Sequence, residues 1–295
     1  MMQHRRSVLL GLAAAGVAAG GPAWSRAAFQ SPRIAVETRG EGPDLILIPG
    51  LASTPAVWTR TIDRLGQGRR LHLVSVHGFG NLPARGNGEG AVMAGVAAEV
   101  RRYIAEAGLP APALIGHSMG GQVGLRVAAD APGRVARLMT VDASPFFPAL
   151  ISPGATVGDV EPIAQVAYQA VQFLGSAGLR ERGRSLGLEL GGAADAVFGS
   201  MGWHGGDRRV LAQALYEVMT VDLRHRLPDI TAPVTVVYGW SADEASPRSR
   251  IGDLFRGAYA SLPRPAVFER IEGAEHMVMI DQPSRFLAAV ERFLA

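Results

Sequence analysis

The chain has 295 residues, 48% of them hydrophobic, so it can bury a sizeable core and is not a disordered polymer. It contains no cysteine, which excludes disulfides, thiolate metal sites, a cysteine nucleophile and a lipid-modified cysteine anchor. The formal net charge of +3 does not indicate nucleic-acid binding, because three unbalanced arginines lie within the first 28 residues and the remainder is electrically neutral.

The N-terminus has the three-part layout of a secretory signal peptide over residues 1–28. Arg5 and Arg6 precede an apolar run from Val8 to Ala19, and small residues follow it. This run is shorter than the roughly 20 residues that span a bilayer. The paired arginines resemble a twin-arginine signal, which implies export of an already folded bacterial protein. We therefore expect a periplasmic or secreted location, with an uncut membrane anchor as the alternative.

The rest of the chain alternates between strand and helix patterns, which favours one α/β domain over residues 29–295. Apolar or alternating runs predict strands at 33–38, 44–48, 71–76, 112–115, 135–141, 233–239 and 265–271. Helical spacing predicts helices at 54–65, 89–107, 121–129, 248–260 and 283–294. The alternation lapses between about residues 145 and 226. The sequence predicts an inserted helical cap there, made of a helix from Glu161 to about Leu174, a glycine-rich stretch at 175–206 and a helix from about Arg208 to Val221.

The strand at 112–115 leads into Gly116-His117-Ser118-Met119-Gly120, and a helix follows directly. A strand, a Gly-x-Ser-x-Gly turn and a helix form the context in which this pattern marks a nucleophile elbow. The turn is too tight for side chains on its flanks, so glycine is needed at 116 and 120. The Ser118 hydroxyl is then held clear of the backbone at a helix N-terminus. The alternative is an ordinary turn whose serine only caps the helix.

At these residues the sequence resembles the α/β-hydrolase superfamily, in its serine esterase, lipase and peptidase branch, from about residue 40 to the C-terminus. The resemblance implies the α/β-hydrolase fold, with a mostly parallel central sheet flanked by helices and a helical cap inserted after the family's sixth strand. It also implies a catalytic triad in the chain order serine, acid, histidine.

The resemblance assigns the other two members of the triad by their positions after predicted strands. His276 lies in the loop after the last strand, where the family keeps its general base; the alternative is a surface histidine. Asp243 follows the preceding strand, where the family usually places the acid. Asp142, at the location used by some lipases, and Glu244, beside Asp243, are the alternative acids.

The resemblance also places two oxyanion donors. The family's first oxyanion loop follows the strand at 44–48, where this chain reads Pro49-Gly50-Leu51. The donors would be the backbone N–H groups of Leu51 and of Met119, the residue after the nucleophile.

These assignments predict a carboxylesterase-like serine hydrolase that cleaves small-molecule esters through an acyl-enzyme intermediate. No metal or cofactor is required, and we expect no nucleic-acid partner and no stable membrane insertion if the signal is cleaved. Two alternatives remain open: a peptidase or amidase of the proline-iminopeptidase type, and a non-catalytic binding protein on the same fold.

Overall fold

The protein is described by a computed structural model, which covers residues 29–185, 205–243 and 245–295. The predicted signal peptide at 1–28 lies outside the described residues, as do Glu244 and residues 186–204 of the predicted cap. Among the helices that the structure describes, none combines the length and the apolar character that a membrane span requires.

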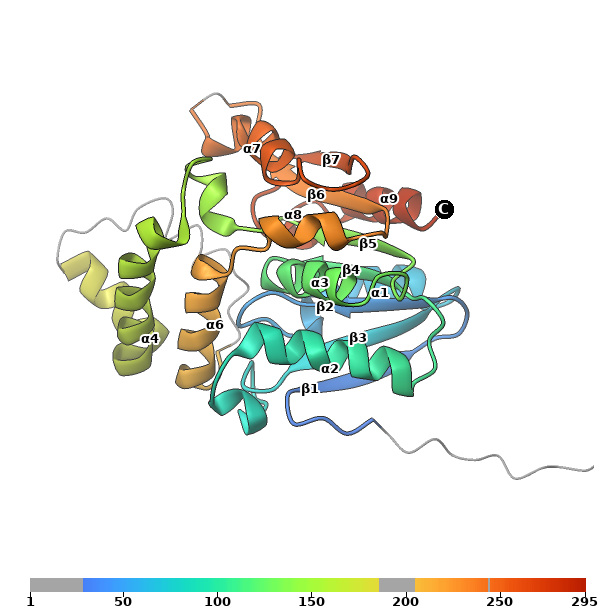
Figure 1. The fold of residues 1–295 in the computed structure, drawn as a ribbon, viewed down its shortest axis with the longest axis horizontal. Coiled ribbons are helices and arrows are strands. Elements are labelled where there is room, and N and C mark those ends of the chain that lie inside the picture. Colours follow the sequence, from blue (N-terminus) through green and yellow to red (C-terminus); the bar gives the residue numbers. More distant parts are fainter. Residues whose placement is uncertain (1–28, 186–204, 244) are drawn as a thin grey trace, which may run out of the picture.

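A seven-stranded sheet in the order β1-β3-β2-β4-β5-β6-β7 forms the centre of the fold (Figure 1). β1 pairs with β3 antiparallel, and all other neighbouring strands are parallel. Because parallel strands end at the same edge of a sheet, the loops after β2, β4, β5, β6 and β7 gather there. The strands span Ile34–Arg39, Asp44–Ile48, Arg70–Val76, Ala113–His117, Arg137–Val141, Val234–Trp240 and Val267–Glu272.

Most of the helices lie between successive strands, and the last two follow the final strand. They are α1 (Thr59–Leu65), α2 (Val92–Glu106), α3 (Met119–Asp130), α4 (Val157–Ser185), α6 (Arg208–Thr220), α7 (Ile251–Ala258), α8 (Val278–Asp281) and α9 (Pro283–Leu294). Short 3₁₀ helices are η1 (Pro55–Trp58), η2 (Arg85–Gly88), η3 (Phe147–Leu150), η4 (Arg224–Asp229) and η5 (Pro247–Ser249).

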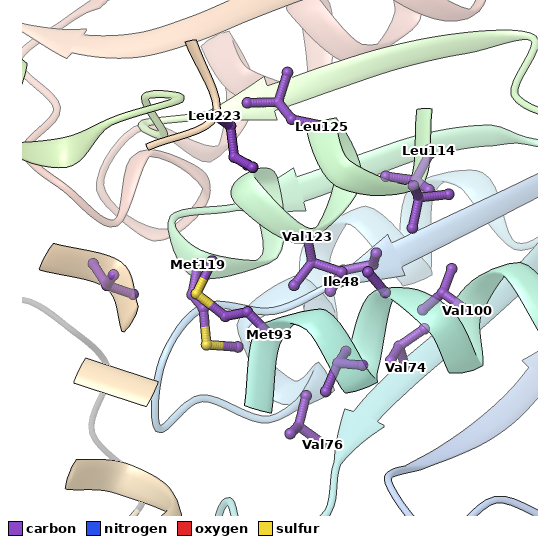
Figure 2. Packing of buried hydrophobic residues seen from close by; sticks show 14 of the residues in the cluster. Ile48, Val74, Val76, Met93, Val100, Leu114, Met119, Val123, Leu125 and Leu223 are labelled. Carbon is purple, nitrogen blue, oxygen red and sulfur yellow. The ribbon is translucent and has the colours of Figure 1, made fainter. Parts of the chain in front are cut away.

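The hydrophobic core covers both faces of the sheet, because successive side chains of a strand point to opposite faces. In β2, Leu45 and Leu47 pack with α1 and α9, whereas Ile46 and Ile48 pack with α2 and α3. Figure 2 shows the second layer, in which side chains of β2, β3 and β4 face those of α2 and α3. These apolar layers fix the strand ends from which the candidate site is built.

The segment between β5 and β6 leaves the strand–helix alternation, at the place where the sequence predicts a cap. There α4 and α6 pack side by side outside the sheet (Figure 1). Glu217 of α6 fixes this pair to the main body. Its carboxylate accepts the N–H groups of Val92 and Met93, at 2.7 and 2.8 Å, and so satisfies the free donors at the start of α2.

Two predicted helices are divided in the structure. The segment predicted at 54–65 forms η1 and then α1, and the segment predicted at 248–260 forms η5 and then α7. In both, a proline opens the 3₁₀ turn, and the side chain of Thr54 or Ser246 accepts a backbone N–H of that turn. Such capping favours a short tight turn before the helix proper.

Candidate active site

Ser118 occupies a strained turn between β4 and α3. Its backbone has φ 52° and ψ −121°, and its N–H donates to the Val141 carbonyl of β5 at 2.9 Å. A Cβ at Gly116 would overlap the Gly120 carbonyl, and a Cβ at Gly120 would overlap the carbonyls of β2 and of the loop after it. The two flanking glycines are therefore required by close backbone approach, as the sequence predicts.

His276 lies in the loop after β7, at the same edge of the sheet, and its carboxylate partner is Asp142. His276 Nδ1 lies 2.7 Å from Asp142 Oδ2, and the two side chains are 16% and 5% exposed. The prediction that Asp243 partners His276 is wrong. Asp142, the alternative acid, occupies that place.

The position of Asp142 in the sheet explains this correction. Asp142 directly follows β5, between β4 and β6, and its N–H donates to Val237 of β6 at 2.7 Å. Asp243 lies three residues beyond the end of β6, where its exposed carboxylate accepts the Ala245 N–H in a local turn at 3.0 Å. This hydrogen bond lies within the loop after β6, whereas the carboxylate bonded to His276 is that of Asp142.

The Asp142 carboxylate is also bound by Arg248 of η5 and by the N–H of Gly239. Arg248 Nη1 and Nη2 lie 2.6 and 2.9 Å from the two carboxylate oxygens, and the Gly239 N–H donates to Oδ1 at 3.2 Å. Burial disfavours the charged form of Asp142, but the Arg248 guanidinium and the His276 hydrogen bond outweigh it and hold the pKa of Asp142 below its ordinary value. Asp142 is therefore ionised near neutral pH.

Backbone strain gathers at this edge of the sheet. Among the described residues, four other than glycine have positive φ, and three of them follow β2, β4 and β5: Ala52 at 56°, Ser118 at 52° and Asp142 at 46°. Such conformations cost on the order of 1–3 kcal/mol each and cluster at functional sites. The strain at Asp142 is an independent sign that this carboxylate, rather than Asp243, belongs to the site.

His117, the residue before the nucleophile, packs against the back of His276. Its Nε2 lies 3.0 Å from the His276 carbonyl oxygen, and the two ring centroids are 4.6 Å apart. Burial, with repulsion from His276, lowers the pKa of His117 to about 3. His117 is therefore neutral, and its Nε2–H donates to the loop that carries the base.

The loop after β2 lies against the nucleophile. A Cβ built on Gly50 would be 3.1 Å from the Cβ of Ser118, so Leu51 follows a residue in close approach to the serine. Met119 begins α3, so its N–H has no intrahelical acceptor. The two predicted oxyanion donors thus belong to the two backbone segments that adjoin Ser118.

Sequence reasoning missed Arg248 and the contact of His117 with the base. Nothing in the local pattern around Arg248 marks it, because its partner is 106 residues away in the chain. Asp142 did carry a signal, since it directly follows a predicted strand.

Across the described ranges, no group of three or more His, Asp or Glu side chains is arranged to hold a metal ion.

Comparison with known proteins agrees with this architecture. A family model described as alpha/beta hydrolase family matches residues 45–290. A pimeloyl-[acyl-carrier protein] methyl ester esterase of Aeromonas hydrophila is 31% identical over 272 residues, which cover 88% of this chain and 99% of the relative. A protein of the same name from Serratia marcescens is 29% identical, with 88% and 97% covered.

Solved structures share the fold. A thermophilic esterase from Thermogutta terrifontis superposes with a TM-score of 0.66 at 20% identity, over 88% of this chain and 92% of that one. A structure from a study of carboxylesterases of Nitrososphaera gargenis gives a TM-score of 0.66 at 18% identity, with 88% and 93% covered.

Proposed function

This chain belongs to the alpha/beta hydrolase family and is an ester hydrolase, and from that premise we propose that it cleaves carboxylic esters through an acyl-enzyme intermediate on Ser118. The observation that carries the proposal is the buried hydrogen bond between His276 and Asp142, beside the strained serine turn. A serine hydroxyl is a weak nucleophile, and an imidazole oriented by a carboxylate is the group that activates it.

The proposed reaction uses His276 first as a base and then as an acid. Ser118 Oγ attacks the ester carbonyl carbon while His276 Nε2 takes the hydroxyl proton, and Asp142 holds the resulting imidazolium. The N–H groups of Leu51 and Met119 bind the oxyanion of the tetrahedral intermediate. The bond to the alcohol oxygen then breaks, and His276 returns its proton to the departing alcohol.

Deacylation repeats the same steps with water. His276 takes a proton from a water molecule, whose oxygen attacks the acyl carbon of the Ser118 ester. Collapse of the second tetrahedral intermediate breaks the bond to Ser118 Oγ, which regains its proton from His276, and the carboxylic acid leaves.

The names of the relatives suggest where to look for the substrate. Those proteins are named esterases of a methyl ester whose acyl group is attached to a carrier protein. We propose that methyl esters of small carboxylic acids are substrates of this chain too.

The first test is hydrolysis of aryl and methyl esters of graded acyl length by residues 29–295, with Ser118→Ala as the matched variant. We expect turnover by the unaltered protein and a loss of at least about 10³-fold in the variant. A fluorophosphonate probe should label the unaltered protein and not the variant. Labelling without ester turnover would point to peptide or amide substrates, and neither labelling nor turnover would contradict the hydrolase mechanism.

A further inference from the structure

The loop after β6 contributes an arginine to the place where the sequence predicts an acid. Arg248 donates two parallel hydrogen bonds to Asp142, and its side chain is only 15% exposed. Parallel bonds of this kind between an arginine and a carboxylate are strong and directional. The carboxylate that orients His276 is thus half of a buried ion pair.

The bonds to Asp142 use both of its oxygens. Oδ2 faces His276 Nδ1 and Arg248 Nη2, while Oδ1 faces Arg248 Nη1 and the Gly239 N–H. A carboxylate has about four acceptor positions, so this one is saturated. Arg248 and the Gly239 N–H fix the plane of the carboxylate. That plane in turn fixes the position of Oδ2, the oxygen that faces the imidazole.

We propose that Arg248 is a positioning residue that fixes the Asp142 carboxylate and offsets its charge beside the His276 imidazole; this rests on the proposed function. A lone carboxylate would favour the imidazolium strongly and leave less free base at low pH. Beside Arg248 the imidazole meets a nearly neutral ion pair instead.

Among the residues that the structure describes, the other charged and titratable groups around His276 do not replace this effect. Glu275, in the same loop, lies 3.4 Å from Arg248 Nε but is 66% exposed, so solvent screens its charge. Asp281 of α8 accepts the Glu275 N–H, and burial raises its pKa. His117 of β4 is neutral, as described above. Arg248 is therefore the buried cation that faces Asp142.

The test is the pH dependence of kcat/KM in Arg248→Gln, compared with Arg250→Gln. Arg250 is exposed two residues further along the same loop, so its variant makes the same change of net charge. We expect Arg248→Gln to move the midpoint of the acidic limb upward by about one pH unit and to lower the plateau. Arg250→Gln should leave both unchanged.

Two further variants separate charge from shape. Arg248→Lys keeps the charge but not the two parallel bonds, so its midpoint should stay near that of the unaltered protein while its plateau falls. Arg248→Met removes the charge while filling the space, and it should move the midpoint as Arg248→Gln does, even if the glutamine variant does not fold. A lower plateau with an unmoved midpoint in both charge-deleting variants would overturn the proposal.

The rate of fluorophosphonate labelling of Ser118 across the same pH range makes the test independent of ester turnover. If the unaltered protein is labelled but hydrolyses no ester, the ester proposal fails while the labelling profile still decides the role of Arg248. If it is neither labelled nor active, both proposals fail together.

Discussion

At the scale of single residues, the acid of the candidate triad is Asp142, because it is the carboxylate that contacts His276. Asp142→Asn keeps the size of the side chain but removes the charge that holds the imidazole in its productive form. We expect this variant to lose on the order of 10³–10⁴-fold in kcat. Asp243→Asn, whose exposed carboxylate serves a local turn, should change kcat by less than about twofold.

Ester hydrolysis by the two purified variants, with circular dichroism to verify folding, checks this prediction. The opposite ranking, with Asp243→Asn inactive and Asp142→Asn active, would mean that the loop after β6 rearranges when substrate binds.

The sequence was sufficient for Ser118 and His276 as site candidates, because a local pattern or a position after the last strand marks each of them. It ranked the acid wrongly because Asp142 and Asp243 both follow strands, and strand ends alone do not show which carboxylate faces inward. Asp142 is held in the inward position by hydrogen bonds from the Gly239 N–H of β6 and from Arg248 in the loop after it.

At the scale of the elements, Glu217 connects α6 to α2 through two hydrogen bonds at a helix N-terminus. Glu217→Ala leaves the N–H groups of Val92 and Met93 without their acceptor, so we expect the free energy of unfolding to fall by about 2 kcal/mol. The matched control is Glu161→Ala on α4, an exposed carboxylate that accepts the Tyr216 hydroxyl at 3.0 Å. It should change stability by less than about 0.5 kcal/mol.

Urea unfolding of both variants measures the difference. An equal, small loss in the two would show that apolar packing alone fixes α6 on α2.

The strands were the elements predicted best, because a continuous apolar run or an alternating run can be recognised in the local sequence alone. The last helix was equally clear, and the predicted range 283–294 matches α9. The helix predicted to end near residue 174 instead continues as α4 to Ser185. Glycines within that segment lower its intrinsic helix propensity, which is why sequence spacing alone ended it early.

At the scale of the whole molecule, buried neutral histidines make stability depend on pH. Burial lowers the pKa of His117 to about 3 and also lowers that of His72. In the unfolded chain a histidine titrates near 6.5, so below that pH the unfolded state binds more protons than the folded state. The stability that these neutral histidines contribute is therefore fully present above about pH 6.5 and is lost as the pH is lowered toward 3.

We expect each such histidine to lower the free energy of unfolding by up to about 1.4 kcal/mol for each pH unit between pH 6 and 5. Urea midpoints across this range should show a slope that His117→Gln reduces, because glutamine keeps an N–H donor but does not titrate. His225→Gln, at an exposed position, should leave the slope unchanged. A slope that neither variant alters would assign the pH dependence to other groups.

The positive φ of Ser118 has a consequence for how this protein would respond to selection. Glycine relieves such a conformation, so Ser118→Gly is expected to be folded, inactive and more thermostable than the unaltered chain. Laboratory evolution that selects only for thermal stability would therefore enrich Ser118→Gly and lose the hydrolase activity. At position 118, thermal stability thus favours glycine, whereas catalysis requires serine.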